Sequence, residues 1–368
     1  MKFLFSVFLL ICHALCSYSQ NIDTSGTILP EIFSQKIKFS AFADIYYAYD
    51  LANPSSHERP SFIYNHNRHN EINLNLGLIK AAYTSNKIRA ALALMAGTYA
   101  QYNLASEPAL LQHVYEANAG IKLKNDRNLW IDAGIFTSHI GFESAISKDC
   151  WTLTRSIVAE NSPYYLSGLK ITYTTISEKL LLSALYLNGW QKIQRQIGNN
   201  SPNFGTQVTY TPNTKLIVNY STFIGSDKPD SNRLWRVYHN FYFIYQPFSK
   251  LGITAGFDYG TEQKYKNTSD LNVWYSPTVI LKYSLSQKFD IAARIEYFDD
   301  PTGVIISTQT PSGFKTSGYS LNFDYKPETN FIVRIEGRVL NSRDKMFTTG
   351  TINSNQNYFM VLSFAVSI

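Results

Sequence analysis

The chain has 368 residues and carries 33 Lys and Arg against 27 Asp and Glu, which gives a formal net charge of +6. Because this excess is small and scattered along the chain, it argues against a nucleic-acid-binding surface. The chain is rich in aromatic residues, with 26 Tyr and 23 Phe, while only 16% of its residues are charged. Such a composition suits β-strands and the aromatic belts of membrane proteins, where a ring lies between lipid and water.

Residues 1–19 have the layout of a secretory signal peptide. A basic start, an apolar core over residues 3–15 and small residues before Gln20 follow one another in the expected order. We therefore expect cleavage before Gln20, a mature chain of residues 20–368, and a periplasmic lead-in segment over residues 20–35. The apolar core is shorter than the roughly 20 residues that a membrane-spanning helix needs, and no later run supplies them. The sequence predicts no helical membrane anchor.

Cysteine usage agrees with export from the cytoplasm. Cys12 and Cys16 would leave with the signal peptide, so Cys150 remains as a single thiol that cannot form an internal disulfide. A lipid anchor on Cys16 is the alternative. It is disfavoured because Leu15 stands directly before that cysteine, where lipid-attachment sites carry a small residue.

Alternation of apolar and polar residues, the signature of a strand with two different faces, recurs through the rest of the chain. Ile or Leu at the even positions of residues 72–78 alternates with Asn or Gly, and residues 251–259 and 319–325 behave similarly. In residues 331–339 the apolar positions alternate with Arg and Glu. Polar faces of this kind indicate that the strands enclose a water-filled interior. The alternation by itself fits either a soluble sandwich or a membrane barrel.

The pattern predicts sixteen strands. They span residues 37–49, 70–84, 87–102, 113–124, 128–138, 164–175, 179–191, 203–211, 214–225, 235–246, 249–262, 272–284, 287–298, 314–326, 330–341 and 356–367.

The connections between these strands alternate in length. Short turns, rich in turn-forming residues, lie at 85–86, 125–127, 177–178, 212–213, 247–248, 286–287 and 327–329. The other connections are longer and lie at 51–69, 103–112, 139–163, 192–202, 226–234, 263–271, 299–313 and 341–355. Short periplasmic turns, long extracellular loops and an even strand count are typical of a transmembrane barrel, and a sandwich has no reason to sort its loops. The sequence therefore predicts an all-β, antiparallel transmembrane β-barrel of about sixteen strands in one domain.

Short aromatic motifs occur in a consistent order along this chain. Residues 129–143 read LWIDAGIFTSHIGFE, residues 42–49 read FADIYYAY, residues 154–157 read TRSI and residues 187–191 read LNGWQ. With Pro163-Tyr164-Tyr165 between them, these motifs resemble the OmpL-like β-barrel porins of the Bacteroidetes, of the outer-membrane porin-2 type. The resemblance spans most of the mature chain. It implies an outer-membrane pore and names no substrate.

Charged residues on the polar faces of the strands are expected to line the lumen, because a charge facing lipid is costly. Opposed acidic and basic groups across a narrow gap would create a transverse field that filters ions. The candidate pore-lining residues are Arg334, Arg338, Glu336, Arg294, Asp44 and Asp132.

The longest connection, residues 139–163, is the third long loop of the predicted barrel, and we expect it to fold inward and narrow the lumen. Its candidate constriction residues are Glu143, Asp149 and Arg155, with Glu143 and Arg155 facing the charged wall. The alternative is that these charges only cap an outer loop, since exposed charges often contribute little.

Other groups that could carry chemistry are isolated. His57, His66 and His69 have no metal-site spacing, and we expect solvated loop histidines and no metal there. Cys150 could be a reactive thiol if it were exposed and activated. No Gly-x-Ser-x-Gly elbow, no histidine with a local catalytic partner and no phosphate-binding loop is present, so we expect no catalytic residues and no cofactor.

The sequence favours an outer-membrane porin that lets small hydrophilic solutes or ions diffuse through a water-filled channel. Its expected surroundings are outer-membrane lipid, and a homotrimer is left open. Two alternatives remain, an outer-membrane enzyme resembling a lipase and a plugged structural or adhesive barrel. Sixteen strands argue against the plugged barrel, because barrels of this size normally enclose an aqueous channel.

Overall fold

A computed structural model describes residues 36–349 and 352–368. The predicted signal peptide and lead-in segment lie outside the described residues. The wall strands are β1 (Ile37–Asp50), β2 (Ile72–Thr84), β3 (Ile88–Ala96), β4 (Val114–Lys122), β5 (Asn128–Thr137), β6 (Tyr165–Thr174), β7 (Leu180–Leu187), β8 (Asn203–Asn213), β9 (Leu216–Gly225), β10 (Arg236–Phe248), β11 (Leu251–Gln263), β12 (Leu271–Ser284), β13 (Phe289–Asp300), β14 (Phe314–Glu328), β15 (Phe331–Ser342) and β18 (Gln356–Ser367).

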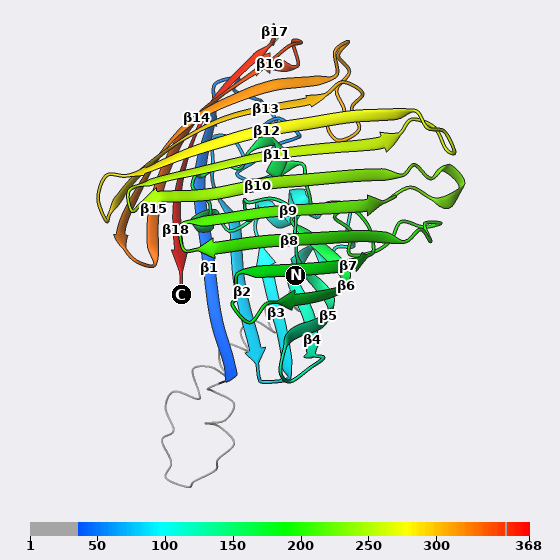
Figure 1. Cartoon of the computed structure of the whole chain (residues 1–368). Helices are drawn as coiled ribbons and strands as arrows, with labels where there is room; N and C mark the ends of the chain where they lie inside the picture. The colour runs from blue at the N-terminus through cyan, green and yellow to red at the C-terminus, as the bar shows by residue number, and fades with distance from the viewer. Residues whose placement is uncertain (1–35, 350–351) are drawn as a thin grey trace. The chain divides into compact units, whose positions relative to one another are not determined.

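These strands form a closed antiparallel barrel in which each strand lies beside its neighbours in the chain (Figure 1). The barrel closes where the first wall strand meets the last, with Phe42 opposite Ser367 and Asp50 opposite Phe359. In the described part of the chain, closure leaves no wall strand at a free edge of the sheet. The predicted fold class and the sixteen-strand wall are confirmed.

The lengths of the connections also follow the prediction. Seven turns contain two to five residues each, whereas every connection at the opposite end of the strands has seven or more. The long connections hold the short helices α3 (Thr98–Asn103), α4 (Ile157–Glu160), η1 (Leu111–His113), η2 (Ser147–Asp149) and η3 (Asp230–Asn232), and the hairpin of β16 (Phe347–Thr349) and β17 (Ile352–Ser354). Within the described ranges, no helix is both long and apolar enough to cross a membrane.

The two faces of the wall differ as the alternation predicts. On β15, Arg334, Glu336 and Arg338 are buried on the inner face, while Ile335 between them is exposed on the outer face. The outer faces of β13 and β14 carry exposed apolar side chains in the same way, among them Ile295 and Leu321. Because such a continuous apolar face is stable only out of water, it is the surface that contacts lipid.

Two predicted strands end at least four residues earlier than expected. The strand predicted over 87–102 stops at Ala96, because Gly97 adopts φ 120 and the chain then enters α3. A Cβ at Gly97 would lie 2.5 Å from the backbone oxygen of Asn75, so only glycine fits this turn. The strand predicted over 179–191 ends at Leu187.

The expected faces of β2 are wrong in its middle. The alternation places Leu76 and Leu78 on the outer face, but both are buried, whereas Ile79 is exposed. Asn75 and Leu76 are adjacent and both have no exposed surface, so the strand changes its facing there. Hydrogen bonds cause this change of facing. They hold the Asn75 side chain inside the barrel, where it donates to Asp44 Oδ2 at 3.3 Å and accepts from the backbone N–H of His66 at 2.8 Å.

The interior is not wet throughout. Near the long-loop ends of the strands, inner-face residues such as Phe223, Trp274 and Phe314 pack against apolar residues of the loops, among them Phe62 and Leu153. We call this group the inner apolar cluster. It shows that the loops fold into the barrel mouth, while the outward apolar face of the strands takes no part in it.

Replacing Ile295 by Arg tests the assignment of the outer face to lipid. Ile295 lies in the middle of β13 and is 62% exposed on that face. We expect Ile295→Arg to lower the free energy of unfolding in lipid vesicles by about 2–4 kcal/mol, because a charge would face hydrocarbon. Denaturant titration measures the loss, with Ile197→Arg as control at a loop position that is 95% exposed. Equal effects of the two substitutions would contradict a lipid-facing surface at Ile295.

Candidate functional site

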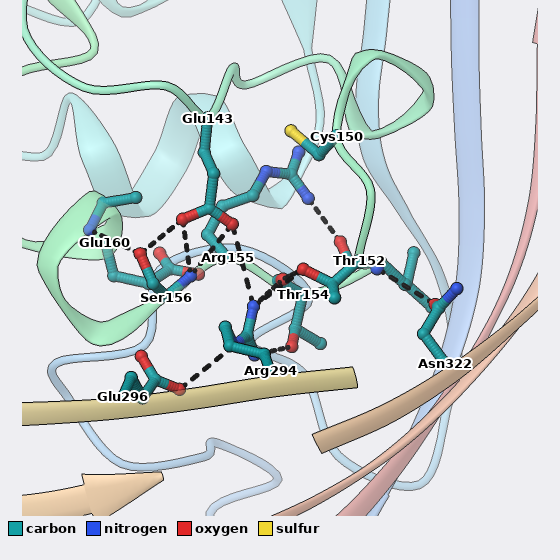
Figure 2. Close-up of polar contacts among 12 residues, drawn as sticks. Glu143, Cys150, Thr152, Thr154, Arg155, Ser156, Glu160, Arg294, Glu296 and Asn322 are labelled. Atoms are coloured by element: carbon teal, nitrogen blue, oxygen red, sulfur yellow. Dashed lines mark hydrogen bonds and ion pairs between the residues drawn. The ribbon is translucent and has the colours of Figure 1, made fainter. Parts of the chain in front are cut away.

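Residues 139–163, here called the inner loop, cross to the inner face of β13, β14 and β15. Arg294 on β13 donates from Nη1 to Thr152 Oγ1 at 2.9 Å and to the Thr154 carbonyl at 2.6 Å, as Figure 2 shows. The Asn322 side chain of β14 accepts from the Leu153 N–H at 3.1 Å. These bonds join segments that are 140 to 169 residues apart in the chain, and they fix the inner loop inside the barrel.

Buried ion pairs surround this contact. Arg294 lies 3.7 Å from Glu143 of the inner loop, 3.2 Å from Glu296 and 3.1 Å from Glu336. Arg338 contacts Glu296 at 2.5 Å. None of these wall side chains is more than marginally exposed. A buried charge that loses its partner is strongly destabilised, so each member of this network depends on the others.

A second anchoring contact joins β14 and β15 to the inner loop. Arg334 binds Asp324 through two parallel hydrogen bonds of 2.8 and 3.0 Å, the paired geometry that suits guanidinium and carboxylate. Its remaining donors reach the carbonyl oxygens of Ser147 and Cys150 in the inner loop. Arg334 therefore joins its own wall to the loop backbone.

The predicted constriction residues have different surroundings. Glu143 accepts hydrogen bonds from the Ser156 backbone and hydroxyl and faces Arg294 as expected, while burial raises the pKa of its carboxyl. Arg155 is fully buried and donates to the carbonyls of Ser144, Ala145 and Leu153, so it braces the loop from within rather than facing the lumen. Asp149 is exposed.

The first long loop is tied to the inner loop. Glu160 Oε2 accepts from the backbone N–H groups of Tyr64 and Asn65 at 3.0 and 3.1 Å and from the Asn65 amide at 3.0 Å. Burial raises the pKa of the Glu160 carboxyl. Among the residues that the structure describes, none forms a hydrogen bond with the other oxygen, Oε1. One carboxylate thus holds two loops together, and we call this contact the loop clasp.

The expectation of solvated loop histidines is wrong for two of the three. His66 is buried with Nε2 3.0 Å from Asp44, and His69 is buried between the Asp50 backbone and Asn53. Burial lowers the pKa of both imidazoles. These rings complete the packing of the first loop. Over residues 36–349 and 352–368, no three His, Cys, Asp or Glu side chains are grouped to hold a metal ion.

Cys150 is packed inside the inner loop. Its Sγ accepts from the Ser144 N–H at 3.2 Å, and burial raises the pKa of the thiol. A buried thiol with a raised pKa is a poor nucleophile. Cys150 therefore contributes to the packing of the inner loop.

On the other side of the barrel a cavity lies against the wall beside the start of the inner loop, at His139. This cavity of about 470 Å³, here called the β2–β8 cavity, is lined by residues of β2 to β8. Asp132, one of the predicted lining residues, lies in it and pairs with Arg89 through both oxygens. Lys80 and Glu116 form a second pair at 2.6 Å. Polar side chains including Asn118, Thr172 and Gln207 complete the lining.

The predicted charges lie on the inner side of the wall, and no pattern in the sequence indicates what covers them. Five predicted lining residues are hidden under loop contacts, namely Arg294, Arg334, Glu336, Arg338 and Asp44. Four charged residues of the cavity were missed, namely Lys80, Arg89, Glu116 and Lys170. Each of the four lies in a predicted strand, so alternation within those strands was the available signal.

Removing the central guanidinium tests the anchoring role of the wall. Arg294→Gln leaves three buried carboxylates without their shared cation, and we expect a loss of about 3–5 kcal/mol in the free energy of unfolding. Limited proteolysis should then cut the inner loop faster. The control is Arg127→Gln, which removes an exposed arginine of a periplasmic turn. Unchanged cleavage in Arg294→Gln would contradict the anchoring role.

The loop clasp should depend on pH. Because the folded pKa of Glu160 is raised, the folded state binds more protons than the unfolded state, and the clasp weakens as pH rises through that pKa. Protease cleavage of the inner loop should therefore be faster at pH 8 than at pH 5. Glu160→Gln should flatten this dependence, because an amide oxygen can accept the same three hydrogen bonds.

Glu160→Ala is the contrasting variant. It removes the acceptor of all three hydrogen bonds, and we expect it to cost about 1–3 kcal/mol at every pH. If Glu160→Gln kept the full pH dependence of the wild type, the carboxyl would not be the titrating group.

Comparison with known proteins agrees with the geometry. The profile of the family described as "Putative beta-barrel porin-2, OmpL-like" matches residues 36–368. No curated protein sequence matches the chain.

Solved structures with a similar fold are outer-membrane proteins. An anion-selective porin from Comamonas acidovorans matches with a TM-score of 0.60 and 6% identity, covering 90% of this chain and 99% of its own. A loop-deletion mutant of OmpT from Vibrio cholerae matches at 0.58 and 12%, with 90% and 99% covered. The outer-membrane channel DcaP of Acinetobacter baumannii matches at 0.58 and 10%, with 90% and 97% covered. At such identities the likeness concerns the fold. Since the family profile spans nearly the whole chain, the protein belongs to the OmpL-like β-barrel porin-2 family.

Proposed function

We propose that this outer-membrane porin passes small hydrophilic solutes or ions by passive diffusion, and that permeation follows the β2–β8 cavity beside the inner loop. One observation carries the proposal. The inner loop is bonded to β13, β14 and β15, and a polar cavity of about 470 Å³ remains along β2 to β8. A sixteen-strand wall is wide enough to hold a folded loop and an aqueous path together.

The predicted lining residues then act in two ways. Asp132 borders the cavity directly. Arg294, Arg334, Glu336 and Arg338 act on permeation through the loop that they hold in place. Glu143 and Arg155 keep that loop folded. The loop narrows the lumen, so the width of the lumen depends on buried ion pairs and not on an exposed ring of charges.

A second cavity, of about 500 Å³, lies among the long loops. Its lining includes Ala52, Pro54 and Glu58 to Phe62, together with Ile306 to Thr310 and Lys345 to Thr348. Its lining mixes charged, hydroxyl and apolar side chains, as suits an outer vestibule where solutes gather before the constriction. We include it in the proposed path.

A plugged structural barrel is the second candidate, and the inner apolar cluster is the observation that favours it. Single-channel recording separates the two. A porin gives discrete conductance steps in planar bilayers, whereas a plugged barrel gives none. We propose no enzymatic activity, and measurable lipid hydrolysis lost on replacing one serine or histidine would argue for a lipase instead.

The proposal includes the route to the membrane. Residues 1–19 act as a cleaved signal peptide, which N-terminal sequencing of the mature protein tests by finding Gln20 first. A homotrimer is the proposed assembly, supported by the trimer form of the related OmpT fold from Vibrio cholerae. Crosslinking in native membranes distinguishes a trimer from a monomer.

Shortening the inner loop tests its role as the constriction. Replacing residues 141–160 by a short Gly-Ser linker removes the material bonded to β13 to β15, and single-channel conductance should rise at least about twofold. The control shortens residues 264–270, a loop at the same end of the barrel, and should leave conductance unchanged. Equal conductance in both variants would show that the inner loop does not narrow the path.

A further inference from the structure

The β2–β8 cavity does not present its charges evenly. Within its two ion pairs the cations are the more exposed members, with side chains 31% exposed for Lys80 and 34% for Arg89. The carboxylates lie behind them, 11% exposed for Glu116 and 4% for Asp132. A solute in the cavity therefore meets ammonium and guanidinium groups first.

Lys170 adds a cation that forms no salt bridge with any described residue. Within the described ranges no carboxylate lies within 4.0 Å of its ammonium, which instead lies 4.5 Å from the centre of the Phe136 ring. Contact with the ring face favours a cation without neutralising it. The register places Lys170 opposite Asp132 on β5, but Arg89 already occupies both oxygens of that carboxylate.

The charge balance of the lining is positive. Three cations, Lys80, Arg89 and Lys170, stand against two carboxylates, Glu116 and Asp132, and 3 − 2 gives +1. His139 also borders the cavity, but burial lowers the pKa of its imidazole to about 4, so it is neutral at pH 7. Low-dielectric barrel walls concentrate the field of such a charge within the cavity.

We propose that the β2–β8 cavity is an anion-binding subsite of the channel, with Lys170 as its principal cation, and that it takes small solutes carrying carboxylate or phosphate groups. The inference rests on the proposed channel function. Lys80 and Arg89 flank the anion, and neighbouring groups such as Thr172, Ser183 and Gln207 supply hydrogen-bond donors. A cavity of about 470 Å³ holds an anion of this size together with water.

The reversal potential across a planar bilayer with a tenfold KCl gradient tests the subsite. The wild-type channel should prefer chloride over potassium, and Lys170→Gln should lower that preference by about threefold, as expected for one charge a few ångströms from the path in water. Lys170→Glu should reverse the preference, and Lys170→Arg should retain it.

Lys326→Gln is the matched control. It removes one lysine charge from β14, far from the cavity lining, where Lys326 pairs with Asp290 at 2.7 Å. Its reversal potential should equal that of the wild type. A shift of the same size in Lys170→Gln and Lys326→Gln would overturn the assignment of the subsite to the cavity, because any charge on the inner face would then affect ion selectivity equally.

Inorganic phosphate serves as the binding probe. Added to a chloride-conducting channel, it should reduce chloride current in a saturable way, with a half-blocking concentration that rises several-fold in Lys170→Gln. The channel and the subsite can fail separately. Absence of conductance in the wild type would overturn the proposed function itself, whereas a conducting wild type with no phosphate block and no effect of Lys170→Gln would overturn only the subsite.

Discussion

A membrane wall built of strands has to satisfy every backbone hydrogen bond within itself, because lipid offers no partner to an unpaired N–H or C=O group. In this protein the pairing of β1 with β18 meets that requirement by joining the two ends of the sheet. Closure then divides the side chains of each strand between lipid and lumen. The remaining features of the molecule depend on the side chains that face the lumen and on their contacts there.

Many charged side chains on the lumen side are buried and not exposed to water, because the inner loop covers them. Guanidinium and carboxylate groups taken out of water are stable only when each has partners. Arg294 meets this condition by binding two wall carboxylates and the loop at once. The inner-face charges of β13 and β15 therefore hold the loop in place, and the proposed path lies beside it, along β2 to β8.

Much of the fold could be predicted from the sequence, because a strand with one face in lipid must alternate and turns must be short on one side. Alternation located the inner face of β15 correctly through Arg334, Glu336 and Arg338. It was wrong for Leu76, where hydrogen bonds of Asn75 to Asp44 and His66 decide the facing. Those partners come from other segments, so local periodicity holds no information about them.

The candidate site was predictable only in part for the same physical reason. Inner-face charges are a property of single strands, but whether a charge meets water depends on a loop that folds across the lumen. Lys170 and Arg294 look alike in the sequence, as cations at inner positions of strands. Arg294 is sealed by Thr152 and Thr154, while Lys170 remains against Phe136 in a cavity. The distinction between an anchoring charge and a charge that lines the cavity is thus set by the loop, which binds Arg294 directly and leaves Lys170 to the proposed channel.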